Sequence, residues 1–116
     1  MMKAIISMVI LLFSITAFSQ EQRVEYEKIS NNLVKATYYF VDNSDVIQRE
    51  GYFNSNNQLQ DMWVSYDING NKKIIAYYDK NKKVGVWTYF SKDKINFVTY
   101  KENKLIGVEE KLLVVN

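Results

Sequence analysis

The chain has 116 residues, of which 15 are basic and 13 acidic, and its formal net charge at neutral pH is +2. This charge is too small for the phosphate neutralisation on which nucleic-acid binding proteins depend, so we expect no nucleic-acid partner. The sequence contains no histidine and no cysteine, which excludes a disulfide framework, a thiol nucleophile, a histidine general base and the usual zinc ligands, and we expect no metal and no cofactor.

The first residues have the pattern of a secretory signal peptide. Lys3 precedes an apolar run at residues 4–13, and small residues follow at 14–19. The run is shorter than the roughly 20 residues that span a bilayer, so we expect residues 1–19 to form a cleaved signal helix. Cleavage is expected after Ser19, with Ala17 as a competing site and an uncleaved anchor as the alternative. The mature chain would then be periplasmic or extracellular, with no stable membrane anchor.

Residues 20–116 are predicted to form one all-β domain. Apolar and polar residues alternate with a period of two, in runs rich in β-branched and aromatic residues that are separated by polar turn residues. Short connections force neighbouring strands to be antiparallel, which predicts a meander of β-hairpins in a single curved sheet. The expected strands are residues 24–29, 33–41, 46–53, 59–66, 72–79, 84–90, 95–100 and 104–113.

Turn residues support this division of the chain. Between the expected strands 59–66 and 72–79, Asn69 and Gly70 both tolerate a positive φ angle, which predicts a two-residue type I′ turn. The other connections are rich in Asn, Asp, Ser and Lys, and their short polar side chains favour turns by bonding to the nearby backbone.

A similar phrase occurs twice, as DMWVSYD at residues 61–67 and VGVWTYF at residues 84–90. Residues 78–85 align with residues 100–107 without a gap, and residues 53–61 fit the same frame with one insertion and with Asp61 in place of glycine. A weaker copy surrounds Tyr38. Each unit is one β-hairpin, which cannot bury its apolar face alone, so we expect the units to lie side by side. The repeat-defining residues are Phe53, Tyr66, Tyr78, Gly85, Tyr100 and Gly107.

These repeats resemble the MORN (membrane occupation and recognition nexus) type, in the variant found in YwqK-type antitoxin proteins of bacteria. The likeness rests on a pattern that recurs along the chain in this order: an aromatic residue, a polar turn, Lys, an aliphatic residue, Gly, Trp and Tyr. Residues 77–90 match this pattern best. Residues 53–66 match without the glycine, and residues 100–109 end before any Trp. The resemblance covers residues 33–110 and implies a repeat-built sheet for binding or scaffolding, with antitoxin-like or immunity-type neutralisation as one use.

Alternation along the strands puts aromatic residues on both faces of the sheet. We expect either that the sheet curls around one face and exposes an aromatic ladder on the other, or that the termini fold back over the second face. The candidate binding surface is Trp63, Tyr77, Trp87 and Tyr89, a platform for a protein strand, a sugar ring or peptidoglycan. The same rings also suit a purely structural cross-strand ladder, and both interpretations stay open.

The acidic residues do not predict catalysis. Glu25 with Glu27, and Glu109 with Glu110, are the carboxylate pairs worth considering, but no apolar segment beside them would raise a pKa. No glycine-rich loop precedes a helix, which argues against nucleotide chemistry. We therefore expect a non-enzymatic module that binds another protein, including by strand addition to an edge without proline. The alternative is carbohydrate or cell-wall binding through the aromatic residues.

Overall fold

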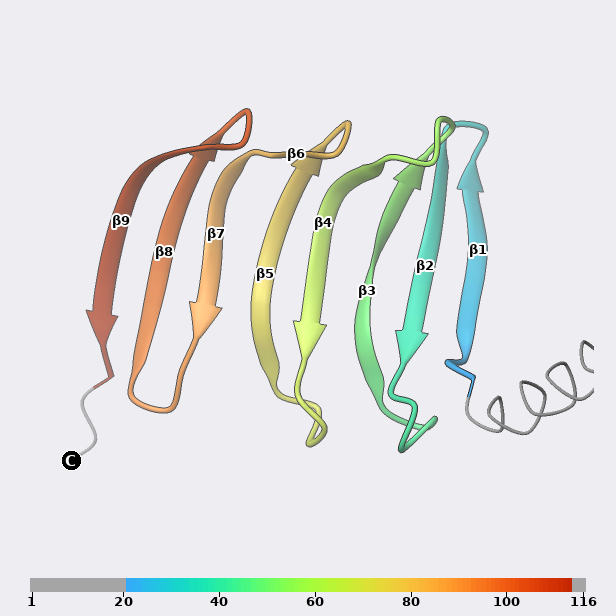
Figure 1. The fold of residues 1–116 in the computed structure, drawn as a ribbon, viewed down its shortest axis with the longest axis horizontal. Coiled ribbons are helices and arrows are strands. Elements are labelled where there is room, and N and C mark those ends of the chain that lie inside the picture. Colours follow the sequence, from blue (N-terminus) through green and yellow to red (C-terminus); the bar gives the residue numbers. More distant parts are fainter. Residues whose placement is uncertain (1–20, 114–116) are drawn as a thin grey trace, which may run out of the picture.

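The computed structural model describes residues 21–113, which form one antiparallel β-sheet (Figure 1). The predicted signal peptide, residues 1–19, lies outside these residues. Residues 21–113 contain no helix that could cross a membrane. The strands are β1 (Val24–Ser30), β2 (Leu33–Tyr39), β3 (Ile47–Asn54), β4 (Leu59–Tyr66), β5 (Lys72–Asp79), β6 (Lys82–Lys83), β7 (Gly85–Phe90), β8 (Lys94–Lys101) and β9 (Lys104–Leu112).

The spatial order of the strands follows their order in the chain, with the short β6 paired to β5 off the main path. The predicted all-β meander is therefore confirmed. The strand predicted at residues 84–90 corresponds to β7, which begins one residue later, and the short β6 precedes it. Gly85 begins β7 with a φ of 72°, a left-handed conformation that interrupts the regular ladder.

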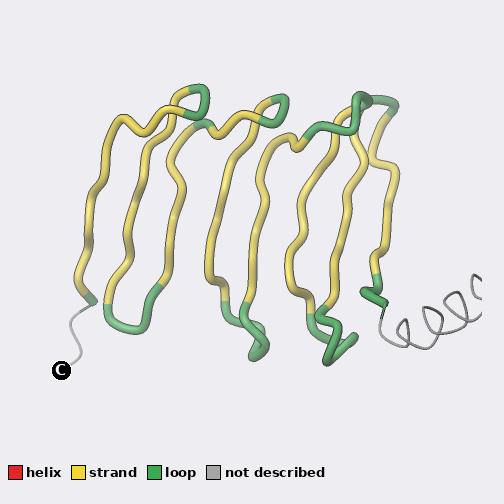
Figure 2. Tube along the Cα trace, viewed as in Figure 1, coloured by secondary structure: helices red, strands yellow, loops and turns green. Residues whose placement is uncertain are grey.

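The sheet is a single layer. Figure 2 shows the strands side by side, with the turns at the two ends of the sheet. Within residues 21–113 the chain ends do not fold back over the second face, so that expected arrangement is absent from the described part of the chain. The consequence is that both faces must be stabilised by contacts between side chains of neighbouring strands.

The register assigns each residue to a face. Trp63 pairs with Ala76, and Trp87 pairs with Val98, so these four residues share one face, which we call the Trp face. Ala36 pairs with Gly51 on the same face. Small residues thus stand beside both indole rings, and the buried cluster of the molecule forms there: Ala36, Trp63, Ala76, Trp87 and Val98. We call the opposite face the reverse face.

The turn after β4 differs from the prediction. Only Gly70 has a positive φ, at 86°, and Asn69 does not share it. The Asp67 Oδ1 accepts hydrogen bonds from the backbone N–H groups of Asn69 and Asn71, both at 2.9 Å. The Asp67 N–H donates to the Asn71 carbonyl at 2.8 Å and closes the loop. The predicted two-residue type I′ turn is therefore wrong here, because the carboxylate holds the loop in another conformation.

Paired left-handed residues of the type I′ kind occur at two other turns. Lys80 and Asn81 have φ values of 50° and 70°, and Glu102 and Asn103 have 48° and 71°. The Asn81 Oδ1 also accepts a hydrogen bond from the Leu59 N–H at 2.7 Å, and the Asn103 Oδ1 accepts one from the Lys83 N–H at 2.8 Å. Each of these asparagines therefore joins its own hairpin to the hairpin before it.

Candidate interaction surfaces

Trp63 lies flat across the neighbouring strand rather than projecting from the sheet. Its Nε1–H donates a hydrogen bond to the Tyr52 carbonyl at 3.0 Å, and Phe53 meets the ring edge-on at 5.1 Å between centroids. A Cβ atom added to Gly51 would fall 2.0 Å from the Trp63 Cδ2, so the ring occupies the space that a side chain would need. As a result Trp63 is only 5 % exposed in a one-layer sheet.

Trp87 repeats this arrangement one hairpin later. Its Nε1–H donates to the Tyr77 carbonyl at 3.1 Å, and its ring is also 5 % exposed. Tyr78 and Tyr100 meet the ring edge-on, at 5.2 and 5.1 Å between centroids, while Tyr89 is tilted against it at 6.2 Å. Both tryptophans of the candidate binding surface thus serve as the buried centre of the Trp face, with partly buried rings around them.

The four residues proposed as one binding surface do not lie together. Trp63, Trp87 and Tyr89 share the Trp face, but Tyr77 pairs with Met62 on the reverse face. Only its backbone carbonyl reaches Trp87. The separation follows from the register, because strand residues of opposite parity point to opposite faces.

The repeat-defining residues divide by role. Phe53, Tyr78 and Tyr100 all pack edge-on against a tryptophan. Tyr66 instead donates a hydrogen bond to Glu50 at 2.9 Å, and burial together with this bond raises the pKa of Tyr66 to about 12. Gly85 is left-handed, whereas Gly107 is not among the residues with positive φ and pairs with Thr99 in the ladder.

Asp61 shows what replaces the missing repeat glycine. Its φ is 59°, close to the 72° of Gly85 at the equivalent place in the next unit. The ladder between β3 and β4 is irregular in the same region, between Glu50 and Tyr52. The second repeat therefore keeps the backbone conformation without the glycine, at the steric cost of a side chain in the left-handed region.

Cations cover the aromatic clusters of the Trp face. The Arg49 guanidinium carbon lies 4.3 Å from the Tyr38 ring centroid and 5.6 Å from that of Trp63. The Lys83 Nζ lies 4.9 Å from the centroid of Trp87 and 5.1 Å from that of Tyr100. The Trp face therefore presents charged groups and tyrosine edges to its surroundings, not open indole faces.

The reverse face exposes a more apolar group at its centre. Met62, Tyr77 and Val86, which we call the reverse-face row, stand on β4, β5 and β7 and are 38–47 % exposed. The Tyr77 hydroxyl lies 3.8 Å from the Met62 Sδ. Val64, two positions along from Met62 on the same face, is buried, so the row borders packed side chains. The sequence predicted Tyr77 as a surface residue but not Met62 and Val86, although each alternates with a neighbouring tryptophan along its strand.

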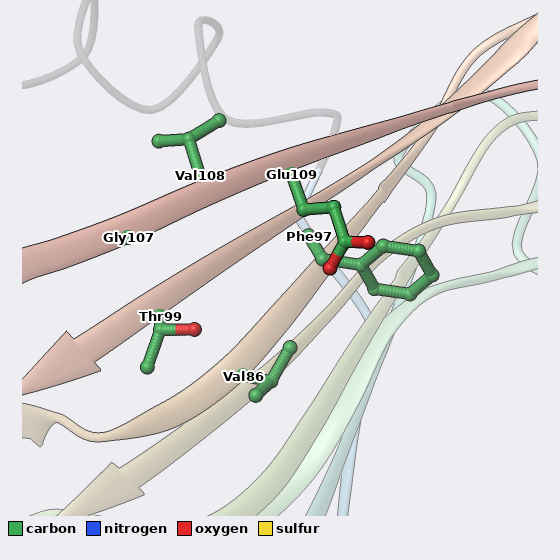
Figure 3. A pocket seen from close by; sticks show the side chains of 6 residues that line it. All are labelled: Val86, Phe97, Thr99, Gly107, Val108 and Glu109. Carbon is green, nitrogen blue, oxygen red and sulfur yellow. The ribbon is translucent and has the colours of Figure 1, made fainter.

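A shallow groove continues from this row toward β9. It has a volume of about 440 Å³ and is lined by Val86, Phe97, Thr99, Gly107, Val108 and Glu109 (Figure 3). The groove is open because Gly107 has no side chain, and in Figure 3 the Val108 side chain points to the other side of the sheet. It therefore offers surface contact rather than an enclosed site.

The acidic residues are engaged in ordinary surface contacts. Glu25 lies 3.1 Å from the Arg23 guanidinium and also accepts a hydrogen bond from the Tyr39 hydroxyl. Glu110 lies 3.2 Å from the Lys94 Nζ. Among residues 21–113 no group of acidic side chains is arranged to hold a metal ion. Both carboxylates therefore lie at the surface of the sheet, paired with a neighbouring cation.

Comparison of the chain with models of known protein families, with curated proteins and with solved structures gives no match. The resemblance to MORN-type repeats therefore stays a prediction, based on the recurring aromatic phrase.

Proposed function

We propose that this chain is an exported, non-enzymatic module that binds another protein through the reverse-face row. The observation that carries this proposal is the exposure of Met62, Tyr77 and Val86 on one face of neighbouring strands. Met and Tyr side chains are enriched where protein interfaces are most buried, since Met adapts its shape and Tyr supplies rigid contact area. A flat group of this kind suits the surface of a folded partner.

The opposite face of the sheet makes the row rigid. Behind it, the backbone carbonyl of Tyr77 accepts the indole N–H of Trp87, and Trp63 packs across the next pair of strands. These contacts limit the motion of the strands that carry the row. Binding of a partner therefore costs less free energy for ordering this surface than it would if the row stood on a flexible loop.

Charges beside the row favour a protein partner with both polar and apolar contacts. The Lys35 Nζ and Glu50 lie 3.9 Å apart on the reverse face, and Glu109 borders the groove at its other end. An apolar centre with a charged rim is the usual anatomy of a protein interface. Neutralisation of a toxin-like protein, the use that the repeat resemblance implies, is one role that such a surface would serve.

Site-specific photo-crosslinking in exporting cells tests the proposal. A photoreactive phenylalanine analogue at Met62 or Val86 should give one discrete product with a second protein, and the Tyr77→Glu substitution should abolish it. Ile68 is a matched control, because it is similarly exposed but stands in the loop after β4. Equal products from Ile68 and Val86, or a product that survives Tyr77→Glu, would refute binding through the row.

A glycan titration separates the carbohydrate alternative. Because Trp63 and Trp87 are buried and their N–H groups are bonded to the backbone, we expect no change in tryptophan fluorescence with cell-wall glycan fragments. A saturable change would favour carbohydrate binding over the protein partner.

A further inference from the structure

The edge strand β9 is the longest strand of the sheet and leaves apolar side chains exposed. It has nine residues and pairs with β8, and among residues 21–113 nothing pairs with its outer side. Val108 and Leu112 are 64 % and 68 % exposed. Val108 pairs with Val98, next to Trp87, so the apolar layer of the Trp face stops at this edge without a covering neighbour. A long apolar edge of this kind favours pairing with another strand.

The backbone groups available for such pairing can be identified. The Leu113 N–H donates to the Asp93 carbonyl at 2.8 Å and therefore points inward, toward β8. Backbone groups alternate in direction along an antiparallel strand, so those of Val108, Glu110 and Leu112 point outward. These three residues supply the free donors and acceptors of the edge.

We infer that two copies of this chain pair through β9, antiparallel and centred on Glu110, to form one continuous sheet. In this register Val108 of each copy faces Leu112 of the other, and Glu109 faces Lys111. The arrangement has a two-fold axis through the Glu110 pair, so every other contact occurs twice and the assembly closes as a dimer. This inference concerns the edge of the sheet and is independent of binding through the reverse-face row.

Charge selects this register among the alternatives. Centring the pair on Val108 sets Ile106 against Glu110, and centring it on Glu109 sets Val108 against Glu110. Centring on Glu110 instead gives two Glu109–Lys111 contacts on the reverse face, while Val108 and Leu112 pair on the Trp face. The two facing Glu110 carboxylates are each neutralised by Lys94, 3.2 Å away in its own chain.

The shape of the edge agrees with this pairing. The Glu110-centred register sets Leu113 of one copy opposite Gly107 of the other, on the reverse face. Gly107 has no side chain there and leaves the groove beside Val86 and Phe97 open (Figure 3). A leucine side chain at this place would cover part of the groove, and Leu113 is itself exposed in the single chain.

The other edge is less suited to self-pairing. Pairing β1 with itself about Tyr26 sets Glu25 against Glu27 twice, and like charges directly opposite each other are destabilising. Arg23 lies 3.1 Å from Glu25, but this register brings no opposite charges face to face, as Glu109 and Lys111 are in the β9 pair. Pairing β9 of one copy with β1 of the next would leave free edges and give open chains instead of dimers. When β9 is paired with β1 so that opposite charges face each other, Glu27 faces Lys111. A substitution of Glu27 therefore distinguishes this open-chain contact from the β9 dimer.

Disulfide trapping tests the register at the level of single residues. Directly opposite residues in a hydrogen-bonded pair have Cα atoms about 5.5 Å apart, within the range of a disulfide. The full chain contains no cysteine, so Glu110→Cys should give a covalent dimer in most of the exported protein under mild oxidation. Val108 is on the same strand and face but lies opposite Leu112 of the other copy, not opposite Val108. The Val108→Cys variant should therefore stay monomeric in non-reducing gel electrophoresis. Equal yields from the two variants, or none from Glu110→Cys, would overturn the inference.

A charge swap provides the second test, by analytical ultracentrifugation of the protein purified after export. Glu109→Lys and Lys111→Glu should each weaken the dimer about tenfold, because attractive pairs become repulsive twice, and the double swap should restore it. Glu27→Lys makes the same change in charge on β1 and should leave the dimer unchanged. A monomer at all concentrations, open-ended polymers, or equal weakening by Glu27→Lys would contradict the proposed pairing.

Discussion

Replacing Gly51 with alanine should destabilise the sheet far more than the size of a methyl group suggests. The new Cβ would lie 2.0 Å from the Trp63 Cδ2 and 2.3 Å from Cε2 and Cγ, whereas ordinary contact begins near 3.4 Å. The ring would have to rise by about 1.4 Å, which breaks its hydrogen bond to Tyr52 and its edge contact with Phe53. Overpacking of about 1–3 kcal/mol and a lost hydrogen bond of about 1 kcal/mol together predict a loss of about 2–4 kcal/mol.

Urea unfolding followed by tryptophan fluorescence in dilute solution measures this effect, and Gly107→Ala is its control. The same added methyl group at Gly107 would meet the Thr99 Cβ at 3.9 Å, so we expect a change within about 0.5 kcal/mol. For Gly51→Ala the melting temperature should fall by roughly 10–25 °C. In a Trp63→Leu background the cost of Gly51→Ala should shrink. Equal stability of the two glycine variants would refute the role given to the flat Trp63 ring.

Three further results are expected. Asn81→Ala removes the acceptor of the Leu59 N–H and puts alanine at a φ of 70°, so urea unfolding should show a loss of about 1–3 kcal/mol, and Asn81→Gly should lose less. Asp61→Gly should raise stability by about 0.5–1 kcal/mol because the φ of 59° then carries no steric cost, and a lower urea midpoint would contradict this. Burial and a hydrogen bond with Tyr100 raise the pKa of Tyr89 to about 12, above its value near 10 in the unfolded chain. The neutral phenol therefore stabilises the folded state fully below pH 10, and this contribution declines between pH 10 and pH 12. Unfolding measured at pH 9 and pH 11 should show a smaller decline in Tyr89→Phe, and an equal decline in both proteins would contradict the assignment.

The sequence predicted the strands well because their signals are local. Alternation of apolar residues marks a strand from its own side chains, and polar turn residues mark its ends, so the predicted bounds of most strands agree with the structure to within two residues. The prediction failed at the turn containing Asn69 and Gly70, where two residues that tolerate positive φ did not both adopt it. There the Asp67 carboxylate bonds to two backbone N–H groups, an interaction that the identity of the turn pair alone does not reveal.

The candidate surface was predicted less well because it depends on register. Tyr77 was grouped with Trp63 and Trp87 by residue type, and the structure places it on the other face, opposite Met62. The ladder between β4 and β5 is regular from Asp61 and Tyr78 to Ser65 and Ile74, and it sets Tyr77 one position away from the partner of Trp63. A shift of one residue reverses the face of every side chain that follows, so no count along one strand decides which rings meet.

By itself the sequence determined that this protein is an antiparallel meander of hairpins, because alternation and turn chemistry act between residues close in the chain. Only the tertiary structure decided that the sheet is one layer, that both tryptophans are buried against small residues of adjacent strands, and that Met62, Tyr77 and Val86 are left exposed. The physical reason is that burial depends on which residues the backbone register brings side by side. That register is set by bulges and by hydrogen bonds between hairpins, whose partners lie far apart in the chain.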